Sequence, residues 1–100
     1  MTQYYTHADH ENAVIDYERR ALAWLLQRAR PRMYGGYGSP YDTANEWRQI
    51  ADAFAGAAFE CDHAARLGGK QRNTWLSRAN DYRAKAADAD RRSRHATAAA

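Results

Sequence analysis

The residues of this chain that could carry out chemistry are a single cysteine, four histidines and the carboxylates beside them. Glu60 and His63 have the Glu-x-x-His spacing that di-iron carboxylate bundles use twice, but the chain holds no second pair of this kind. His7 and His10 stand one helical turn apart, a spacing that suits a divalent ion, yet the sequence offers them no third ligand. We therefore expect these side chains to be solvated surface groups, without a metal or other cofactor.

Cys61 and Glu18 are the other candidates for reactive groups. At about 100° per residue, Cys61 shares a helical stripe with Trp47, which predicts a buried structural thiol. Glu18 falls inside an apolar arc of its segment, so it needs a partner, and we expect an arginine such as Arg78 or Arg83. Neither group belongs to a Ser/His/Asp set or a phosphate-binding glycine loop, so we expect no enzymatic activity.

Two breaks divide the chain into the elements that must position these side chains. The stretch 31–42 contains three glycines and two prolines, and Gly68 with Gly69 can close a preceding helix in the left-handed conformation. Little outside these breaks is typical of β structure. The sequence predicts an all-α, single-domain three-helix bundle over residues 1–100, with helices at about 8–30, 43–67 and 72–95 and mobile ends at about 1–5 and 93–100.

A small residue between two aromatic residues recurs in each predicted helix, at positions i, i+4 and i+7. Such trios let a neighbouring helix approach closely at the small residue. They are Tyr17-Ala21-Trp24, Trp47-Ala51-Phe54 and Trp75-Ala79-Tyr82. The middle trio with Ile50 resembles the first helix of a tetratricopeptide repeat over about eight residues, but the predicted helix continues where that family turns. The resemblance therefore implies nothing about function.

The bulky apolar content is small, because Leu, Ile, Val and Phe together number ten while alanines number 22. The inward positions predicted for the third helix are Trp75, Ala79, Tyr82, Ala86 and Ala89, which supply little volume. Thin cores gain stability by association, so we expect a homodimer through an Ala/aromatic face. No run of about 18 apolar residues and no leader-like segment occurs, and we expect a cytoplasmic protein without a membrane partner.

Positive charge gathers toward the carboxyl end. Residues 70–100 carry eight Lys or Arg against three acids, whereas residues 1–30 are balanced at four against four. Arginine favours bidentate contact with phosphate or carboxylate, so one hypothesis is a nucleic-acid-binding surface on the third helix. Its residues would be Arg78, Arg83, Arg91, Arg92 and Arg94.

The stretch 31–41 is unusually rich in aromatic residues for a connection. Tyrosine and arginine often carry interface energy, and a glycine-rich frame lets them adapt to a partner. We predict a partner-binding surface made of Arg30, Arg32, Met33, Tyr34, Tyr37 and Tyr41. An alternative is that these tyrosines cover the open end of the bundle.

The favoured function is a non-enzymatic interaction protein that occupies the surface of a protein or nucleoprotein partner. Small inhibitors encoded by phages or mobile elements, such as anti-CRISPR proteins, are of this size, and an inhibitor of that kind is the expected example. The nucleic-acid-binding protein with the arginine-rich third helix is the alternative.

Overall fold

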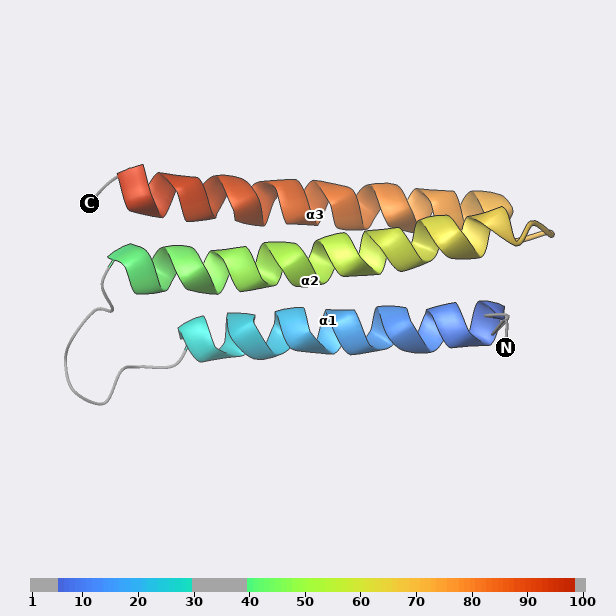
Figure 1. Cartoon of the computed structure of the whole chain (residues 1–100), viewed down its shortest axis with the longest axis horizontal. Helices are drawn as coiled ribbons and strands as arrows, with labels where there is room; N and C mark the ends of the chain where they lie inside the picture. Colours follow the sequence, from blue (N-terminus) through green and yellow to red (C-terminus); the bar gives the residue numbers. More distant parts are fainter. Residues whose placement is uncertain (1–5, 30–39, 99–100) are drawn as a thin grey trace, which may run out of the picture.

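The computed structural model describes residues 6–29 and 40–98. They form three α-helices, each of which runs antiparallel to the one before it (Figure 1). α1 spans His7–Ala29, α2 spans Pro40–Arg66 and α3 spans Arg72–Ala98. The predicted all-α three-helix bundle is confirmed, and the described residues contain no strand. α2 begins at Pro40 instead of residue 43, because proline fits the first turn of a helix, where its missing N–H is not needed.

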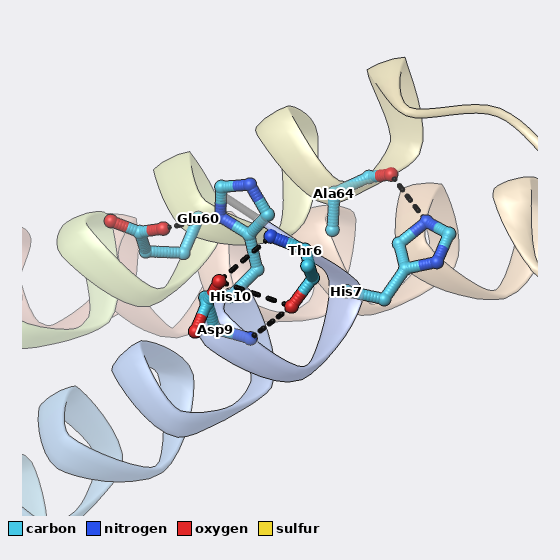
Figure 2. A network of polar contacts seen from close by, with 6 residues as sticks. All are labelled: Thr6, His7, Asp9, His10, Glu60 and Ala64. Atoms are coloured by element: carbon cyan, nitrogen blue, oxygen red, sulfur yellow. Dashed lines mark hydrogen bonds and ion pairs between the residues drawn. The ribbon is translucent and has the colours of Figure 1, made fainter. Parts of the chain in front are cut away.

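The start of α1 is a capping box, as the spacing of Thr6 and Asp9 predicts. The backbone N–H of Thr6 donates to Oδ2 of Asp9 at 2.8 Å, and the backbone N–H of Asp9 donates to Oγ1 of Thr6 at 3.2 Å (Figure 2). These two bonds satisfy N–H groups that have no partner inside the helix. The bond from the Thr6 backbone also holds the pKa of Asp9 below its ordinary value.

The turn between α2 and α3 uses two glycines in the left-handed region. The φ angles are 78° at Gly68 and 94° at Gly69, which other residues adopt only with strain. The N–H of Leu67 donates to the Ala64 carbonyl at 3.2 Å, and that of Gly68 donates to the Ala65 carbonyl at 3.1 Å. The prediction that this pair of glycines closes the second helix is therefore confirmed.

α2 is the central helix and packs against both of the others. The Cα atoms of α1 and α3 do not come within 8 Å of each other, and Figure 1 shows α2 drawn between them. α2 consequently buries two rows of side chains. The predicted row is found, with Trp47 half-buried and Ala51, Phe54, Ala58, Cys61 and Ala65 buried. A second row adds Ala53, Ala57 and Ala64.

Close approach between α1 and α2 depends on a small residue at the crossing. A Cβ atom at Gly56 would lie 2.5 Å from Cε1 of Tyr17, so the tyrosine ring fits only because position 56 has no side chain. Ala21, which is fully buried, plays the same part on α1.

α3 buries Trp75, Ala79, Tyr82 and Ala89 as predicted, while Ala86 is half-buried. Ser93 is also buried, and its hydroxyl donates to the carbonyl oxygen of Ala44 at 2.7 Å. This bond attaches the end of α3 to the beginning of α2. α3 continues to Ala98, and the expected mobile end at about residues 93–100 stays a prediction. Among the residues that the structure describes, no helix combines the length and hydrophobicity needed to cross a membrane.

Candidate functional site

Side-chain contacts between α1 and α3 divide the bundle into two halves. In one half, long side chains of α3 cross over α2 to reach α1, and we call residues 7–18, 54–66 and 72–82 the closed half. In the other half α3 presents short side chains to α1, and we call residues 19–29, 40–53 and 83–98 the open half. In Figure 1 the closed half lies toward the N label and the open half toward the C label.

The closed half is held by rings and ion pairs between α1 and α3. The rings of His7 and Trp75 stack with their centroids 6.1 Å apart. Arg78 donates two hydrogen bonds to the Glu11 carboxylate, at 2.6 and 3.1 Å, and its guanidinium also lies 4.5 Å from the centroid of the Trp75 ring. These bonds hold the pKa of Glu11 below its ordinary value and raise that of Arg78. Within the described residues, the buried Nε1 of Trp75 has no hydrogen-bond partner.

Glu18 has a different partner from the predicted one. The hydroxyl of Tyr82 donates to its carboxylate, and Glu18 is exposed at the edge of α1 that faces α3. Burial raises the pKa of Tyr82 to about 12, and this hydrogen bond is the second cause of the rise. Arg78 donates to Glu11 instead, and Arg83 donates to Asp62. The predicted arginine partner is therefore wrong, because Glu18 lies at the margin of the apolar arc, within reach of a long tyrosine.

The histidines of the closed half join α1 to α2, as Figure 2 shows. Nδ1 of His10 lies 2.7 Å from Oε2 of Glu60, and Nε2 of His7 lies 3.2 Å from the carbonyl oxygen of Ala64. His10 is 7% exposed, and its ring stacks on that of His63. The expectation that these groups are solvated is wrong for His10, which is buried between α1 and α2, whereas His7, Glu60 and His63 are half-buried. Within the described part of the chain, no group of three or more His, Cys, Asp or Glu side chains could hold a metal ion.

Cys61 is buried on the α2 stripe with no exposed surface. Burial raises the pKa of its thiol to about 11, so the thiolate that reacts with electrophiles is scarce near neutral pH. The prediction of a structural thiol is confirmed.

The open half contains a groove, because α3 has no long apolar side chain there. Where Trp75 and Tyr82 fill the closed half, the following inward positions are Ala86, Ala89, Ser93 and Ala96. They leave a hollow of about 460 Å³ between α1 and α3, floored by α2. Its apolar lining consists of Leu22, Leu25, Trp47, Ile50 and Ala89 of the open half, with Phe54 at the boundary to the closed half. Glu18, at the same boundary, also lines the hollow. A second hollow of about 450 Å³ shares Trp47, Asp88 and Arg92 with the first, and we call the two together the open-half groove.

An exposed apolar row on α1 borders this groove. Ile15, Leu22 and Leu26 lie on one face of the helix and are 39%, 49% and 65% exposed. Leu22 also lines the groove, so the row meets the groove at this residue. The sequence does not predict this surface, because Leu22 shares an apolar arc of the helix with Val14 and Leu25 and is expected in the core.

The α3 wall of the groove is positively charged. Lys85, Arg91, Arg92 and His95 line it, with one carboxylate, Asp88, among them. Asp88 accepts from Arg91 at 2.7 Å and from Arg92 at 2.9 Å, and these bonds hold its pKa below the ordinary value. The Arg92 guanidinium also lies 4.9 Å from the centroid of the Trp47 ring, which is half-buried.

The five arginines predicted to contact nucleic acid all bind carboxylates of the chain itself. Two of the pairs join helices, Arg78 to Glu11 and Arg83 to Asp62. Three lie within α3, since Arg91 and Arg92 share Asp88 and Arg94 pairs with Asp90. The structure does not gather these arginines into one unpaired positive face.

The predicted partner-binding residues Arg30, Arg32, Met33, Tyr34 and Tyr37 lie outside the described residues. Tyr41 belongs to the first turn of α2, and its side chain also lies outside the description.

Comparison with known proteins gave no matching family model, no similar curated protein and no similar solved structure. The function is therefore argued from the geometry of the bundle.

Proposed function

We propose that the chain is a non-enzymatic interaction protein that binds an amphipathic helix of a protein partner in the open-half groove. The observation that carries the proposal is the apolar floor of the groove together with exposed Leu22 at its α1 edge and exposed Leu26 one turn further along α1. Contiguous exposed apolar surface with a polar rim is typical of interaction sites. A helix laid between α1 and α3 would stand opposite α2 and complete a four-helix arrangement.

The charges of the groove indicate what the partner helix carries. Its apolar row would meet Leu22, Leu26 and Trp47, and its flank toward α3 would meet Lys85, Arg91 and Arg92. These three positive charges outnumber the two carboxylates that line the groove, Asp88 on α3 and Glu18 on α1. Acidic residues on that flank would complement the wall. From residue 85 to residue 96 the α3 wall runs about 16 Å, which accommodates about three helical turns.

The chemistry of the closed half supports a binding role over catalysis. Cys61 is buried with a raised pKa, and the carboxylate and histidine side chains that could act as acid or base are engaged in joining helices. Nucleic-acid binding through α3 has weaker support, because each of its five arginines already faces a carboxylate.

The test compares two leucines of equal exposure. Leu22 borders the groove and Leu67 lies outside it, and both are 49% exposed. A photo-crosslinking amino acid at position 22 should capture a partner from the encoding organism, whereas one at Phe59, which is 60% exposed, should not. Against the purified partner, Leu22→Asp should weaken binding by about tenfold or more while Leu67→Asp leaves it unchanged.

Equal binding by the two aspartate variants would contradict the proposal. A Tyr34→Ser, Tyr37→Ser double variant tests the sequence prediction for the connection, because loss of the partner in that variant alone would assign binding to the tyrosines. Sedimentation of the free protein tests the predicted homodimer. A dimer that Leu22→Asp dissociates would make a second copy of this chain the occupant of the groove.

A further inference from the structure

A third hollow is lined mostly by charged residues. It lies between the end of α2 and the beginning of α3, has a volume of about 640 Å³, and is not lined by any described residue of α1. Three guanidinium groups line it, those of Arg66, Arg72 and Arg83, against the single carboxylate of Asp62. It is thus separate from the open-half groove, with which it shares no lining residue.

Positive charge around this hollow is poorly compensated. The stretch 63–80 contains no acidic residue but includes Arg66, Lys70, Arg72 and Arg78. Of these, Arg78 is neutralised by Glu11 across the bundle. Among the described residues, neither Arg66 nor Arg72 forms an ion pair, so two guanidinium groups from different helices face one hollow without a carboxylate of their own.

Arg83 is already oriented at the far wall of the hollow. One of its nitrogens donates to Asp62 at 2.5 Å and the other to the side-chain oxygen of Asn80 at 2.6 Å. A guanidinium held in this way has lost much of its side-chain freedom before a ligand arrives, which lowers the entropic cost of binding. Asp62 neutralises only one of the three positive charges.

We propose that this hollow binds the phosphate group of a small phosphorylated molecule, with Arg66 and Arg72 as its ligands and Arg83 as a pre-oriented third. Planar guanidinium groups pair with phosphate oxygens through two parallel hydrogen bonds. The volume lies in the range of small-molecule sites, and half-buried Leu76 with buried Ala65 supplies an apolar wall for the organic part of the ligand. This site is independent of the helix-binding groove.

Calorimetric titration with inorganic phosphate, pyrophosphate and phenyl phosphate, at matched ionic strength, tests the assignment. We expect all three to bind, with phenyl phosphate tighter than inorganic phosphate because its ring contacts Leu76. Arg66→Ala and Arg72→Ala should each weaken phenyl phosphate binding by about tenfold. Arg48→Ala, an exposed arginine of α2 outside the hollow, is the matched control and should bind like the wild type.

Equal binding by the Arg66→Ala, Arg72→Ala and Arg48→Ala variants would overturn the site. All three positions are exposed, so far-UV circular dichroism should show an unchanged fold and leave a loss of binding attributable to the arginine. The last ligand to titrate is a short DNA duplex. Duplex binding that Arg66→Ala and Arg72→Ala abolish, together with no binding of the small phosphates, would overturn the small-molecule assignment in favour of a nucleic acid backbone.

Discussion

The two halves of this bundle share a helix order but differ in what α3 presents to α1. In the closed half Trp75, Arg78 and Tyr82 reach His7, Glu11 and Glu18, so that three helices form one packed unit. In the open half the equivalent positions of α3 are alanines and a serine, and α1 and α3 each pack on α2 alone. The length of the inward-facing side chains of α3 therefore decides whether the space between α1 and α3 is filled or left as a groove.

This difference separates stability from recognition within one short chain. The closed half contains the cross-helix ion pairs and the aromatic core, which are the contacts expected to hold the fold. The open half exposes Leu22 and Leu26 beside a hollow that the chain itself does not fill. A partner helix would find its binding surface preformed there, while the closed half preserves the arrangement of α1 and α3.

The largest contrast between the halves is expected at their two tryptophans. Trp75 is 3% exposed, and Trp75→Ala should lower the free energy of unfolding by about 3–5 kcal/mol. Trp47 is half-buried at the groove, and Trp47→Ala should cost about 1–2 kcal/mol. Urea denaturation followed by far-UV circular dichroism measures both values.

Trp75→Phe is the control for this comparison, because it keeps a ring in the core and removes the indole N–H that lacks a partner. It should cost less than Trp75→Ala, since an unsatisfied buried donor is itself unfavourable by about 1–3 kcal/mol. Equal losses for Trp75→Ala and Trp47→Ala would remove the distinction between the two halves.

Much of this fold could be predicted from the sequence, because the features that determine it are local. The Thr6–Asp9 capping box, the paired glycines at 68 and 69, and the small-aromatic trios each act within a few residues, and all three are found in the structure. The hydrogen-bond partners of side chains at helix margins are harder to predict from the sequence. Glu18 bonds to Tyr82, and His10 to Glu60, only because of how α1 is rotated and shifted against its neighbours.

The groove could not be predicted for a related reason. The sequence shows that α3 is poor in bulk, and we interpreted this as a need for a second copy through an Ala/aromatic face. In the structure Ala51, Phe54 and Ala79, three residues of the small-aromatic trios, are buried within the chain, and the homodimer stays a prediction. Because α3 lacks side-chain volume, a hollow remains on one side of the bundle, where Ala89 lies across from Leu22 and Leu25.

The same substitution made in each half gives a sharper test. Ala79 is fully buried between aromatic residues of the closed half, and Ala79→Leu should destabilise the protein by about 1–3 kcal/mol through overpacking. Ala89 borders the hollow, so Ala89→Leu has room for its added carbons and should change stability by less than about 1 kcal/mol. Thermal and urea denaturation of the two variants measure the difference.

Ala89→Leu also links packing to function. If the groove receives a partner helix, the added side chain occupies part of the same space and should weaken partner binding while the fold stays intact. A strongly destabilised Ala89→Leu variant would show that the hollow closes in solution.

The smallest expected contrast is in the response to acid. The pKa of Glu11 is lowered in the folded state, so its bond to Arg78 stabilises the fold above the ordinary value of 4.5 and is lost as the pH falls through the lower folded pKa. Asp88 has a lowered pKa too, but its partners Arg91 and Arg92 lie on its own helix. Protonation of Glu11 therefore loosens α1 from α3, whereas protonation of Asp88 affects α3 alone.

We expect Glu11→Gln to flatten the fall in melting temperature between about pH 5 and about pH 3 more than Asp88→Asn does. A larger flattening in Asp88→Asn would show that pairs within α3, and not the bridge across the closed half, carry the acid sensitivity of the bundle.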